Sequence, residues 1–297
     1  MHRRQPLVSV GIPTYNRGAL LRRAIESVLS QDYDNIELVI SDNASTDGTQ
    51  ALCEEFSRRD GRVRYYRQPT NQGLTANFRA VFKYSRGQYY KVLGDDDWID
   101  PTYISHCVRE LEAQPEVSIV YGGTKWYDND RFVQEGAYVS LLMGSGKARI
   151  LEYYKTVQAN EPFYGVMRKD TLLAATQMAN AFGADWFLVA SIAFMGQIKA
   201  IDTTSSHMAH GGTSANEEKT ARVLGLPRYQ ARLSYIFITL FAFRDIAWSS
   251  PTYESLGVPQ RLLLALSVSG VLGGKLLGWS LGNLKLSFDR YLRIIKV

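Results

Sequence analysis

The first 125 residues alternate between two hydrophobic periodicities. Short runs with apolar side chains at every second position predict strands, and apolar positions spaced by three and four between these runs predict helices. Because strands and helices alternate with short connections, we expect an α/β fold with βαβ crossovers and a doubly wound, mostly parallel sheet. The expected strands are residues 7–12, 36–40, 63–66, 89–93 and 117–121.

The pattern changes in two places further along the chain. After Trp126 it becomes a mixture of helix, loop and short strand, and from about residue 223 it becomes helical, aromatic and apolar. We therefore expect a main domain over residues 1–220 and a separate helical segment over residues 221–297. The main domain divides into halves of about residues 1–125 and 126–220.

The net charge of +5 is unevenly distributed. Residues 221–297 carry 10 Lys or Arg against 3 Asp or Glu, a net charge of +7, whereas residues 1–220 carry 24 against 26, a net charge of −2. A main domain without excess positive charge argues against a nucleic-acid partner. A segment that is both basic and apolar favours the surface of an anionic membrane.

The cysteines and the first residues indicate the compartment. Cys53 and Cys107 each lie in a helical pattern, with no second thiol or histidine at the spacing of a metal site, so we expect reduced packing residues. The basic residues at the start are followed by a strand-like run rather than by the apolar core of a secretory signal. Both observations favour the cytoplasm.

The C-terminal segment leaves three alternatives open: attachment to a membrane surface, a true span, and a helical layer packed on the main domain. Residues 262–284 contain one charge, at Lys275, and approach the length of a membrane span, about 20 residues. Residues 281–296 place apolar and basic side chains on opposite faces of a helix, as in helices at a bilayer surface. Glycines at 270, 274, 278 and 282 permit close helix contacts, including self-association into a homo-oligomer.

Three polar clusters follow directly after expected strands. In open parallel sheets, ligands bind beyond the carboxyl ends of the strands, so we expect the three clusters to form one site. The clusters are Pro13-Thr14-Tyr15-Asn16-Arg17, residues 41–48, and Gly94-Asp95-Asp96-Asp97-Trp98.

The most informative cluster contains Asp95, Asp96 and Asp97. Three consecutive carboxylates after a buried strand repel one another unless a positive charge lies among them. Mg²⁺ is usually held by one or two carboxylates together with phosphate oxygens, so a divalent cation on a diphosphate is a natural occupant. The alternative is a solvated acidic turn before the helix that starts near Pro101.

Asp42 is a second candidate binding residue. It comes directly after the second expected strand, where a carboxylate can accept a hydrogen bond from the ring N–H of a base such as uracil. Tyr15, after the first strand, can offer a face for stacking. The alternatives are a turn in which Ser45 or Thr46 caps the next helix, and an ordinary surface tyrosine.

Taken together, these segments resemble the family-two glycosyltransferases of the GT-A fold over roughly residues 7–215. The resemblance implies a metal-dependent, inverting transfer of a sugar from a nucleotide diphosphate, with UDP favoured, to the hydroxyl of a sugar or lipid-linked acceptor. The resemblance is to the members that build bacterial surface polysaccharides, and it implies an enzyme at the inner face of the cell membrane. The matching segments are residues 8–17, 27–31, 40–49, 71–73 with Asn77, and 93–101.

The resemblance also implies roles for individual residues. Thr14, Tyr15 and Asp42 would hold the nucleobase, and Asp95 would contact the donor ribose. Many relatives read Asp-x-Asp-Asp where this chain has Gly94 first, so the register of the metal ligands stays open by one residue. The implied donor-binding residues are Pro13, Thr14, Tyr15, Asn16, Arg17, Asp42, Asn71 and Asp95, and the implied ligands of Mg²⁺ or Mn²⁺ are Asp96, Asp97 and His210.

The resemblance assigns the catalytic base to Asp185. Relatives carry Glu-Asp at the start of a helix, and this chain has Ala184-Asp185 there. Asp185 would remove the proton of the acceptor hydroxyl, and the alternative for this residue is a helix N-cap. His210, directly before two glycines, matches the family's metal-site histidine better than His207 does. Its alternative is an ordinary loop residue.

Two other functions stay open. A catalytically degenerate subunit that binds nucleotide sugars as a scaffold is favoured by Ala184, which stands in place of the family's glutamate. A sugar nucleotidyltransferase shares the sheet type and the metal. Such an enzyme normally has a glycine-rich, basic phosphate loop after the first strand, where this chain has Pro-Thr-Tyr-Asn at residues 13–16, and this counts against it.

Overall fold

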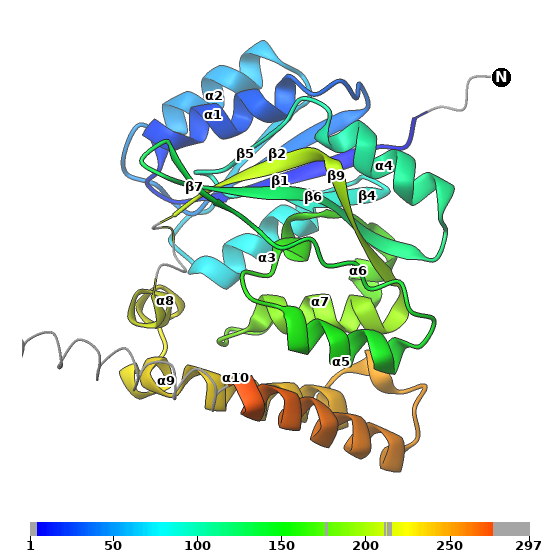
Figure 1. The fold of residues 1–297 in the computed structure, drawn as a ribbon. Coiled ribbons are helices and arrows are strands. Elements are labelled where there is room, and N and C mark those ends of the chain that lie inside the picture. The colour runs from blue at the N-terminus through cyan, green and yellow to red at the C-terminus, as the bar shows by residue number, and fades with distance from the viewer. Residues whose placement is uncertain (1–4, 176–177, 211, 213–215, 276–297) are drawn as a thin grey trace, which may run out of the picture.

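The computed structural model describes residues 5–175, 178–210, 212 and 216–275, and in these residues one large sheet carries helices on both faces (Figure 1). The described residues contribute nine strands to this sheet. Their bounds are β1 Val8–Thr14, β2 Ile36–Asp42, β3 Val63–Arg67, β4 Tyr89–Val92, β5 Trp98–Ile99, β6 Val117–Asp128, β7 Arg131–Glu135, β8 Val166–Arg168 and β9 Gln197–Ala209.

Strands β1 to β4 form a parallel half of the sheet. β1 pairs in parallel with β2 and with β4, and β2 pairs in parallel with β3. β1 and β2 are buried along their whole length, as expected for central strands that are covered on both faces. The parallel strands that the sequence predicts over its first 93 residues are therefore confirmed.

The other half of the sheet is mixed, whereas the sequence predicts a mostly parallel sheet. β6 does not lie beside β4, because β8 is inserted between them and is antiparallel to both. β6 is parallel to β9, while β7 and β5 pair antiparallel to β6 and β9 respectively. β8 has three residues, too few to show the period of a strand. The strand order is β3-β2-β1-β4-β8-β6-β9-β5, with β7 beside β6.

Two sets of helices cover the two faces of the sheet. The first set encloses an apolar core that contains the two unpaired cysteines, Cys53 and Cys107. It consists of α1 Gly18–Leu29, α2 Thr49–Arg59 and α4 Tyr103–Ala113. The second set lies on the opposite face and consists of α3 Leu74–Tyr84, α5 Gly146–Thr156, α6 Lys169–Ala174, α7 Ala184–Met195 and the short 3-10 helix η1 Glu161–Tyr164 (Figure 1).

The C-terminal helices form a further layer against α5 and α7 (Figure 1). Their buried side chains, among them Ala221, Ile238, Ala242, Leu264 and Leu272, share one apolar core with α5 and α7. In the described part of the chain, no helix is long and apolar enough to cross a bilayer. The elements of this layer are α8 Glu217–Leu224, α9 Arg228–Arg232, α10 Ser234–Arg244, the π-helical turn η2 Asp245–Ser249, the 3-10 turn η3 Pro251–Tyr253 and a helix over residues 258–275.

The alternatives for the C-terminal segment are thus partly decided. Packing on the main domain is observed for residues 217–275, while attachment to a membrane surface stays a prediction. Of the glycine row, Gly270 and Gly274 are described, and a side chain at either would meet nothing within 4 Å. The glycines at 278 and 282 and the amphipathic pattern at 281–296 lie outside the described residues.

Candidate active site

The carboxyl ends of β1 and β4 bring the first and third polar clusters together. Thr14, the last residue of β1, is buried, and its hydroxyl donates to Asp95 Oδ2 at 2.8 Å. Asp95 follows β4, and β1 and β4 are neighbours in the sheet. The convergence predicted from the order of the strands is therefore observed for these two side chains.

The loops after β1 and β2 are joined by the side chains of Asn16 and Ser45. Asn16 has a left-handed backbone with φ 54°, a conformation that Asn tolerates better than most residues. Its Oδ1 accepts from the amide of Thr46 at 2.8 Å, and its own amide donates to Ser45 Oγ at 2.9 Å. Ser45 therefore bonds across to the first loop and does not cap α2, whose N-cap residue is Gly48.

Asp42 is fully buried at the end of β2, and both of its oxygens have partners. Oδ1 accepts from the Ser45 amide at 2.8 Å, and Oδ2 accepts from the Tyr65 hydroxyl at 2.7 Å and lies 3.4 Å from Arg67 Nε. A carboxylate offers about four lone-pair sites, but Asp42 has no exposed surface, so a further donor reaches it only when a neighbouring side chain moves. Sequence reasoning missed Tyr65 and Arg67. Their signal was the alternation along β3, which pairs Arg67 with Asp42.

The remaining donor-site candidates surround these loops. Asn71 Oδ1 accepts from Asn43 Nδ2 at 2.8 Å and from the Gly73 amide at 2.9 Å, which fixes the turn into α3 beside the second cluster. Tyr15 is 43% exposed, which leaves it accessible to a ligand. Pro13 lies inside β1, where it pairs with Ser41 of β2 and supports the loop without a side chain that binds.

Of the three acidic residues after β4, two face Arg17 and the third turns away. Asp96 Oδ2 lies 3.6 Å from Arg17 Nη2, and Asp95 Oδ1 lies 4.0 Å from Arg17 Nε. Asp97 turns inward, where its Oδ1 accepts from the amide of Ala209 at 3.0 Å. Gly94 permits this rotamer, because a Cβ at that position would lie 2.4 Å from Asp97 Oδ2.

The electrostatics of this turn favour a bound cation. Burial, together with the charge of Asp96, raises the pKa of Asp95 to about 6 and that of Asp97 to about 7. Arg17 is shared between two of the carboxylates, so the cluster keeps excess negative charge. Among the described residues, no three His, Cys, Asp or Glu side chains form a ready-made metal site. Mg²⁺ and Mn²⁺ prefer oxygen ligands, and phosphate oxygens of a nucleotide can fill the coordination positions that one or two carboxylates leave open. The residues present therefore fit such an ion.

The two candidate histidines at the end of β9 have different surroundings. The ring of His207 stacks on Trp98, and its Nε2 lies 2.8 Å from Asp100 Oδ1, so it belongs to a packed cluster. His210 is exposed just after β9, and its amide donates to the carbonyl of Tyr127 at 2.6 Å. Two residues further, a Cβ at Gly212 would lie 3.6 Å from Asp96 Oδ2. Gly212 therefore lies beside Asp96.

Asp185 is the second residue of α7, and the N-cap position is occupied by Gly183. The alternative that Asp185 is the N-cap residue of α7 is therefore wrong, because Asp185 lies inside the first turn. Its Oδ2 accepts from Asn160 Nδ2 at 2.7 Å, and amides of the first helical turn also stabilise its charge. Burial nevertheless raises the pKa of this carboxyl.

Tyr164 of η1 lies within electrostatic range of both Asp185 and the acidic turn. Burial raises the pKa of its phenol, and the charges of Asp97, Asp185 and Asp96 raise it further. The carbonyl of Tyr164 accepts from Lys91, a buried residue of β4, which fixes η1 to the sheet. Sequence reasoning missed both Tyr164 and Asn160, because they lie outside the segments that carry the resemblance.

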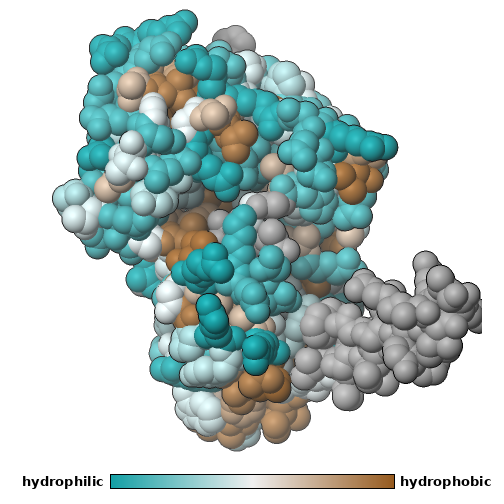
Figure 2. Space-filling model, turned by 90° about the vertical axis from the view of Figure 1, so that its left-hand side faces the viewer, coloured by the Kyte–Doolittle hydropathy of each residue, from teal (hydrophilic) through white to brown (hydrophobic). Residues whose placement is uncertain are grey.

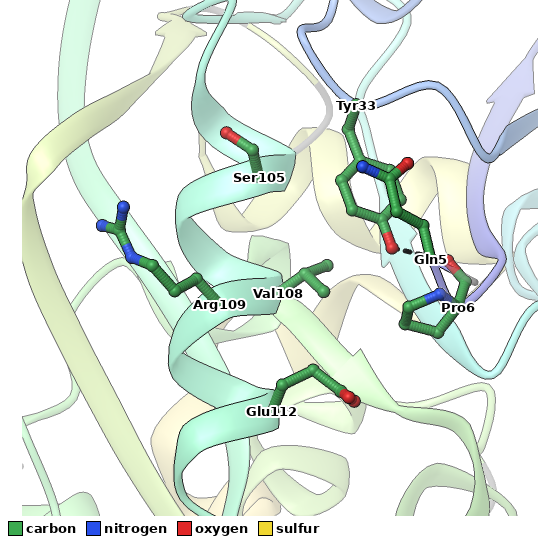
Figure 3. A pocket seen from close by; sticks show the side chains of 7 residues that line it. All are labelled: Gln5, Pro6, Tyr33, Ser105, Val108, Arg109 and Glu112. Atoms are coloured by element: carbon green, nitrogen blue, oxygen red, sulfur yellow. Dashed lines mark hydrogen bonds between the residues drawn. The ribbon is translucent and has the colours of Figure 1, made fainter. Parts of the chain in front are cut away.

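One cavity lies away from this site. It measures about 270 Å³ and opens at the amino end of β1, whereas Thr14 marks the carboxyl end (Figure 3). In it, the hydroxyl of Tyr33 donates to the carbonyl of Pro6 at 2.6 Å. The cavity is therefore not the donor site. It is lined by Gln5, Pro6, Tyr33, Ser105, Val108, Arg109 and Glu112.

Comparison with known proteins identifies the family. Residues 9–173 match the model of glycosyl transferase family 2, which is more than half of the chain, so the chain belongs to this family. Glycosyltransferase GlyA of Streptococcus pneumoniae serotype 4 is 27% identical over 177 residues, which cover 59% of this chain and 24% of that protein. An Escherichia coli K12 protein, WcaA, provisionally named a colanic acid biosynthesis glycosyl transferase, is 28% identical over 207 residues, which cover 69% and 74%. The chain thus spans about a quarter of the streptococcal relative's length.

Solved structures confirm the GT-A-type α/β fold. Residues 1–349 of S. aureus TarS in complex with UDP-GlcNAc align with a TM-score of 0.57 and 16% identity, over 88% of this chain and 79% of that one. Mannosyltransferase PcManGT from Pyrobaculum calidifontis in complex with GDP-Man and Mn²⁺ aligns with a TM-score of 0.57 and 17% identity, over 93% and 81%. At these identities the likeness concerns the fold alone.

Proposed function

We propose that this chain is a metal-dependent, inverting glycosyltransferase that moves a sugar from a nucleoside diphosphate to an acceptor hydroxyl. One observation carries the proposal: Thr14, Arg17 and two carboxylates after β4 meet at the carboxyl ends of β1 and β4. The charge of Asp185 acts on the phenol of Tyr164, as do those of Asp96 and Asp97, so Asp185 lies within electrostatic range of the same side chain as this cluster.

The donor is held through its base, ribose and diphosphate. Asp42 accepts from the base N–H and Tyr15 stacks on the ring, while Asp95 binds the ribose and stays fixed by Thr14. UDP is the favoured nucleotide through the family resemblance, and the ring N–H of uracil, like that of guanine, is a donor that a carboxylate can accept. The TarS structure with UDP-GlcNAc supports this choice for the fold, and the GDP-Man complex is the competing example.

Asp96 with Asp97 or His210 would hold Mg²⁺ or Mn²⁺, and the bound ion would supply positive charge to the departing diphosphate. Arg17 exchanges its ion pair with Asp96 for one with a phosphate, since both partners lie at the same turn. The Mn²⁺ complex of the mannosyltransferase supports a divalent metal on this fold.

Asp185 acts as the general base. Its ionised carboxylate takes the proton of the acceptor hydroxyl, while the acceptor oxygen attacks the anomeric carbon on the face opposite the diphosphate. The bond from that carbon to the diphosphate breaks, and its electron pair leaves with the diphosphate. The configuration at the anomeric carbon is therefore inverted.

Calorimetry and donor hydrolysis test this function. Wild-type protein should bind UDP only with Mn²⁺ and should hydrolyse a nucleotide sugar from a panel that includes UDP-GlcNAc. Asp185→Asn should bind equally well and lose turnover. The alternative is a catalytically degenerate scaffold subunit, which Ala184 favours because it replaces the family's glutamate. If the wild type binds UDP but turns over no donor, the result supports the scaffold function and contradicts the glycosyltransferase function.

The C-terminal layer supports a place at the inner face of the cell membrane, with a sugar or lipid-linked acceptor in surface-polysaccharide synthesis. Nine of the seventeen exposed large apolar side chains in the described residues lie between positions 223 and 266. Figure 2 shows apolar side chains gathered at the lower end of the molecule, where these helices lie. The exposed arginines beside them are Arg222, Arg228, Arg232 and Arg244.

Vesicle binding tests this placement. Leu263 and Leu266 are 67% and 60% exposed on the helix over 258–275, and replacing both by Asp should release the protein from vesicles that contain phosphatidylglycerol. Leu173→Asp is the matched control, because Leu173 is 60% exposed on α6. Equal sedimentation of all three proteins contradicts the membrane surface. A wild-type dimer without vesicles that the double variant abolishes assigns the face to a second copy of this chain.

A further inference from the structure

A chain of buried polar side chains runs from α5 to the proposed catalytic base. The Tyr153 hydroxyl donates to Asn160 Oδ1 at 2.7 Å, and Asn160 Nδ2 donates to Asp185 Oδ2 at 2.7 Å. Tyr153 is 2% exposed and Asn160 is 1% exposed. Neither residue belongs to the segments that predict the site from sequence.

The backbone of Asn160 is held in a sparsely populated conformation. Its φ of 54° and ψ of 44° are left-handed, directly before η1. Residues other than glycine adopt this region rarely, and Asn is among those that tolerate it best. Such conformations persist where the surrounding structure fixes them, often where a side chain is presented in a defined direction. Here the direction is towards Asp185.

The two partners fix the orientation of the Asn160 amide. Burial raises the pKa of Tyr153 well above its ordinary value, so the phenol stays protonated and donates. The Asn160 oxygen therefore faces Tyr153, which leaves its NH₂ group facing Asp185. A donor at 2.7 Å favours the charged carboxylate, whereas burial opposes it by raising the pKa of Asp185.

We propose that Asn160 is the positioning residue of the catalytic base: it fixes the plane of the Asp185 carboxylate and keeps it ionised, and Tyr153 holds Asn160 in turn. This inference rests on the proposed role of Asp185. No bond is made or broken at Asn160, and the proton taken from the acceptor resides on Asp185. A base oriented by a third group is a general feature of activated catalytic sites.

The other ionisable groups around Asp185 do not replace the amide. The phenols of Tyr154 and Tyr164 lie within electrostatic range, and burial raises the pKa of both, so they are neutral at physiological pH. Burial also raises the pKa of Glu161, and a carboxyl group adds no positive charge that could keep Asp185 ionised. The ammonium of Lys275, on the C-terminal helix, donates to a backbone carbonyl instead.

The first experiment measures the ionisation of Asp185 without turnover. Its ¹³C carboxyl resonance is assigned by its loss in Asp185→Asn and is then titrated in wild type and variants. Asn160→Gly permits the left-handed backbone and removes the donor, so the pKa of Asp185 should rise by about 1. Tyr153→Phe should raise it less. An unchanged pKa in both variants overturns the proposal.

The second experiment follows kcat/KM against pH for the hydrolysis of UDP-GlcNAc with Mn²⁺, or of the panel donor that turns over. In Asn160→Gly the acid limb should move to higher pH and kcat should fall about tenfold to a hundredfold, with KM for the donor unchanged. Asn129→Gly is the matched control, because Asn129 is also left-handed, with φ 48°, and lies in the exposed turn between β6 and β7. An equal effect there would assign the loss to backbone freedom and overturn the role of the amide.

Failure of this inference is distinguishable from failure of the proposed function. If wild type hydrolyses no nucleotide sugar, the function falls, and the titration still decides whether Asn160 tunes Asp185. If wild type turns over and Asn160→Gly keeps its acid limb, only the positioning role falls. If Asn160→Gly does not fold, Tyr153→Phe, which removes one hydroxyl, carries both measurements.

Discussion

The donor half and the acceptor half of the proposed site are built in different ways. In the donor half, several bonds tie the loops after β1, β2 and β4 to one another, including those of Thr14 with Asp95 and of Asn16 with Thr46. In the acceptor half, one series of side-chain bonds leads from α5 through Asn160 to Asp185, whose charge the amides of the first turn of α7 also stabilise. In the donor half, several independent bonds hold the same loops. In the acceptor half, each side-chain bond depends on the one before it.

The largest effect is expected from removal of the carboxylates in the donor half. In a double variant, Asp96→Ala with Asp97→Ala, binding of UDP should lose its dependence on Mn²⁺ and turnover should fall about a thousandfold or more, because charge on the leaving diphosphate is no longer neutralised. Calorimetry and donor hydrolysis measure both. Asp202→Asn, an exposed carboxylate of β9, is the control. Wild-type metal-dependent affinity in the double variant contradicts the metal site.

Substitution in the acceptor half should separate the two halves. Asp185→Asn removes the base and keeps the shape of the side chain, so turnover should fall at least about a hundredfold. The affinity for UDP with Mn²⁺ should stay within about twofold of wild type, because no bond of the donor half is touched. A matching loss of affinity would show that the halves are not independent.

A smaller effect is expected where restraints act in parallel. Thr14→Val removes one hydrogen bond to Asp95 at nearly constant volume, while Arg17 still pairs with that carboxylate. The cost should be about 1 kcal/mol, or roughly a fivefold weaker affinity for UDP with Mn²⁺. Isothermal calorimetry measures it, and a loss of a hundredfold would mean that this single bond holds the donor half.

The smallest expected effect is a pH dependence of stability. The pKa values of Asp95 and Asp97 are raised to about 6 and about 7, so between pH 4 and 7 the folded protein binds more protons than the unfolded chain. Without metal, stability should therefore fall as pH rises through this window. Mn²⁺ with UDP requires the ionised form, so its gain in Tm should be about 3 °C larger at about pH 8 than at about pH 5.5. Equal gains contradict the assignment.

The donor half could be anticipated from sequence because its residues lie next to strand ends. Thr14 closes β1 and Asp95 follows β4, so the rule for parallel sheets places them together once the strands are known. Family membership is likewise confirmed. The alternation along β3 places Tyr65 and Arg67 on one face, but their pairing with Asp42 depends on the register of β3 with β2, which a single sequence does not give.

The acceptor half could not be anticipated in the same way. Asn160 lies 25 residues before Asp185, in a turn without periodicity, and its role depends on how η1 packs against α7. The mixed half of the sheet was not anticipated for a similar reason, because the three residues of β8, which separate β6 from β4, are too few to show a periodic pattern. Contacts between distant segments are set by packing, which the local pattern of apolar residues does not encode.

Gly94 has a consequence for exchanging motifs between this chain and its relatives. A side chain at position 94 would displace the Asp97 carboxylate, and with it the bond to the Ala209 amide that fastens the end of β9. Substitutions at 94 and 97 are therefore non-additive, and each must be judged in the background of the other. Grafting the Asp-x-Asp-Asp order onto this scaffold calls for a compensating change at position 97 in the same step.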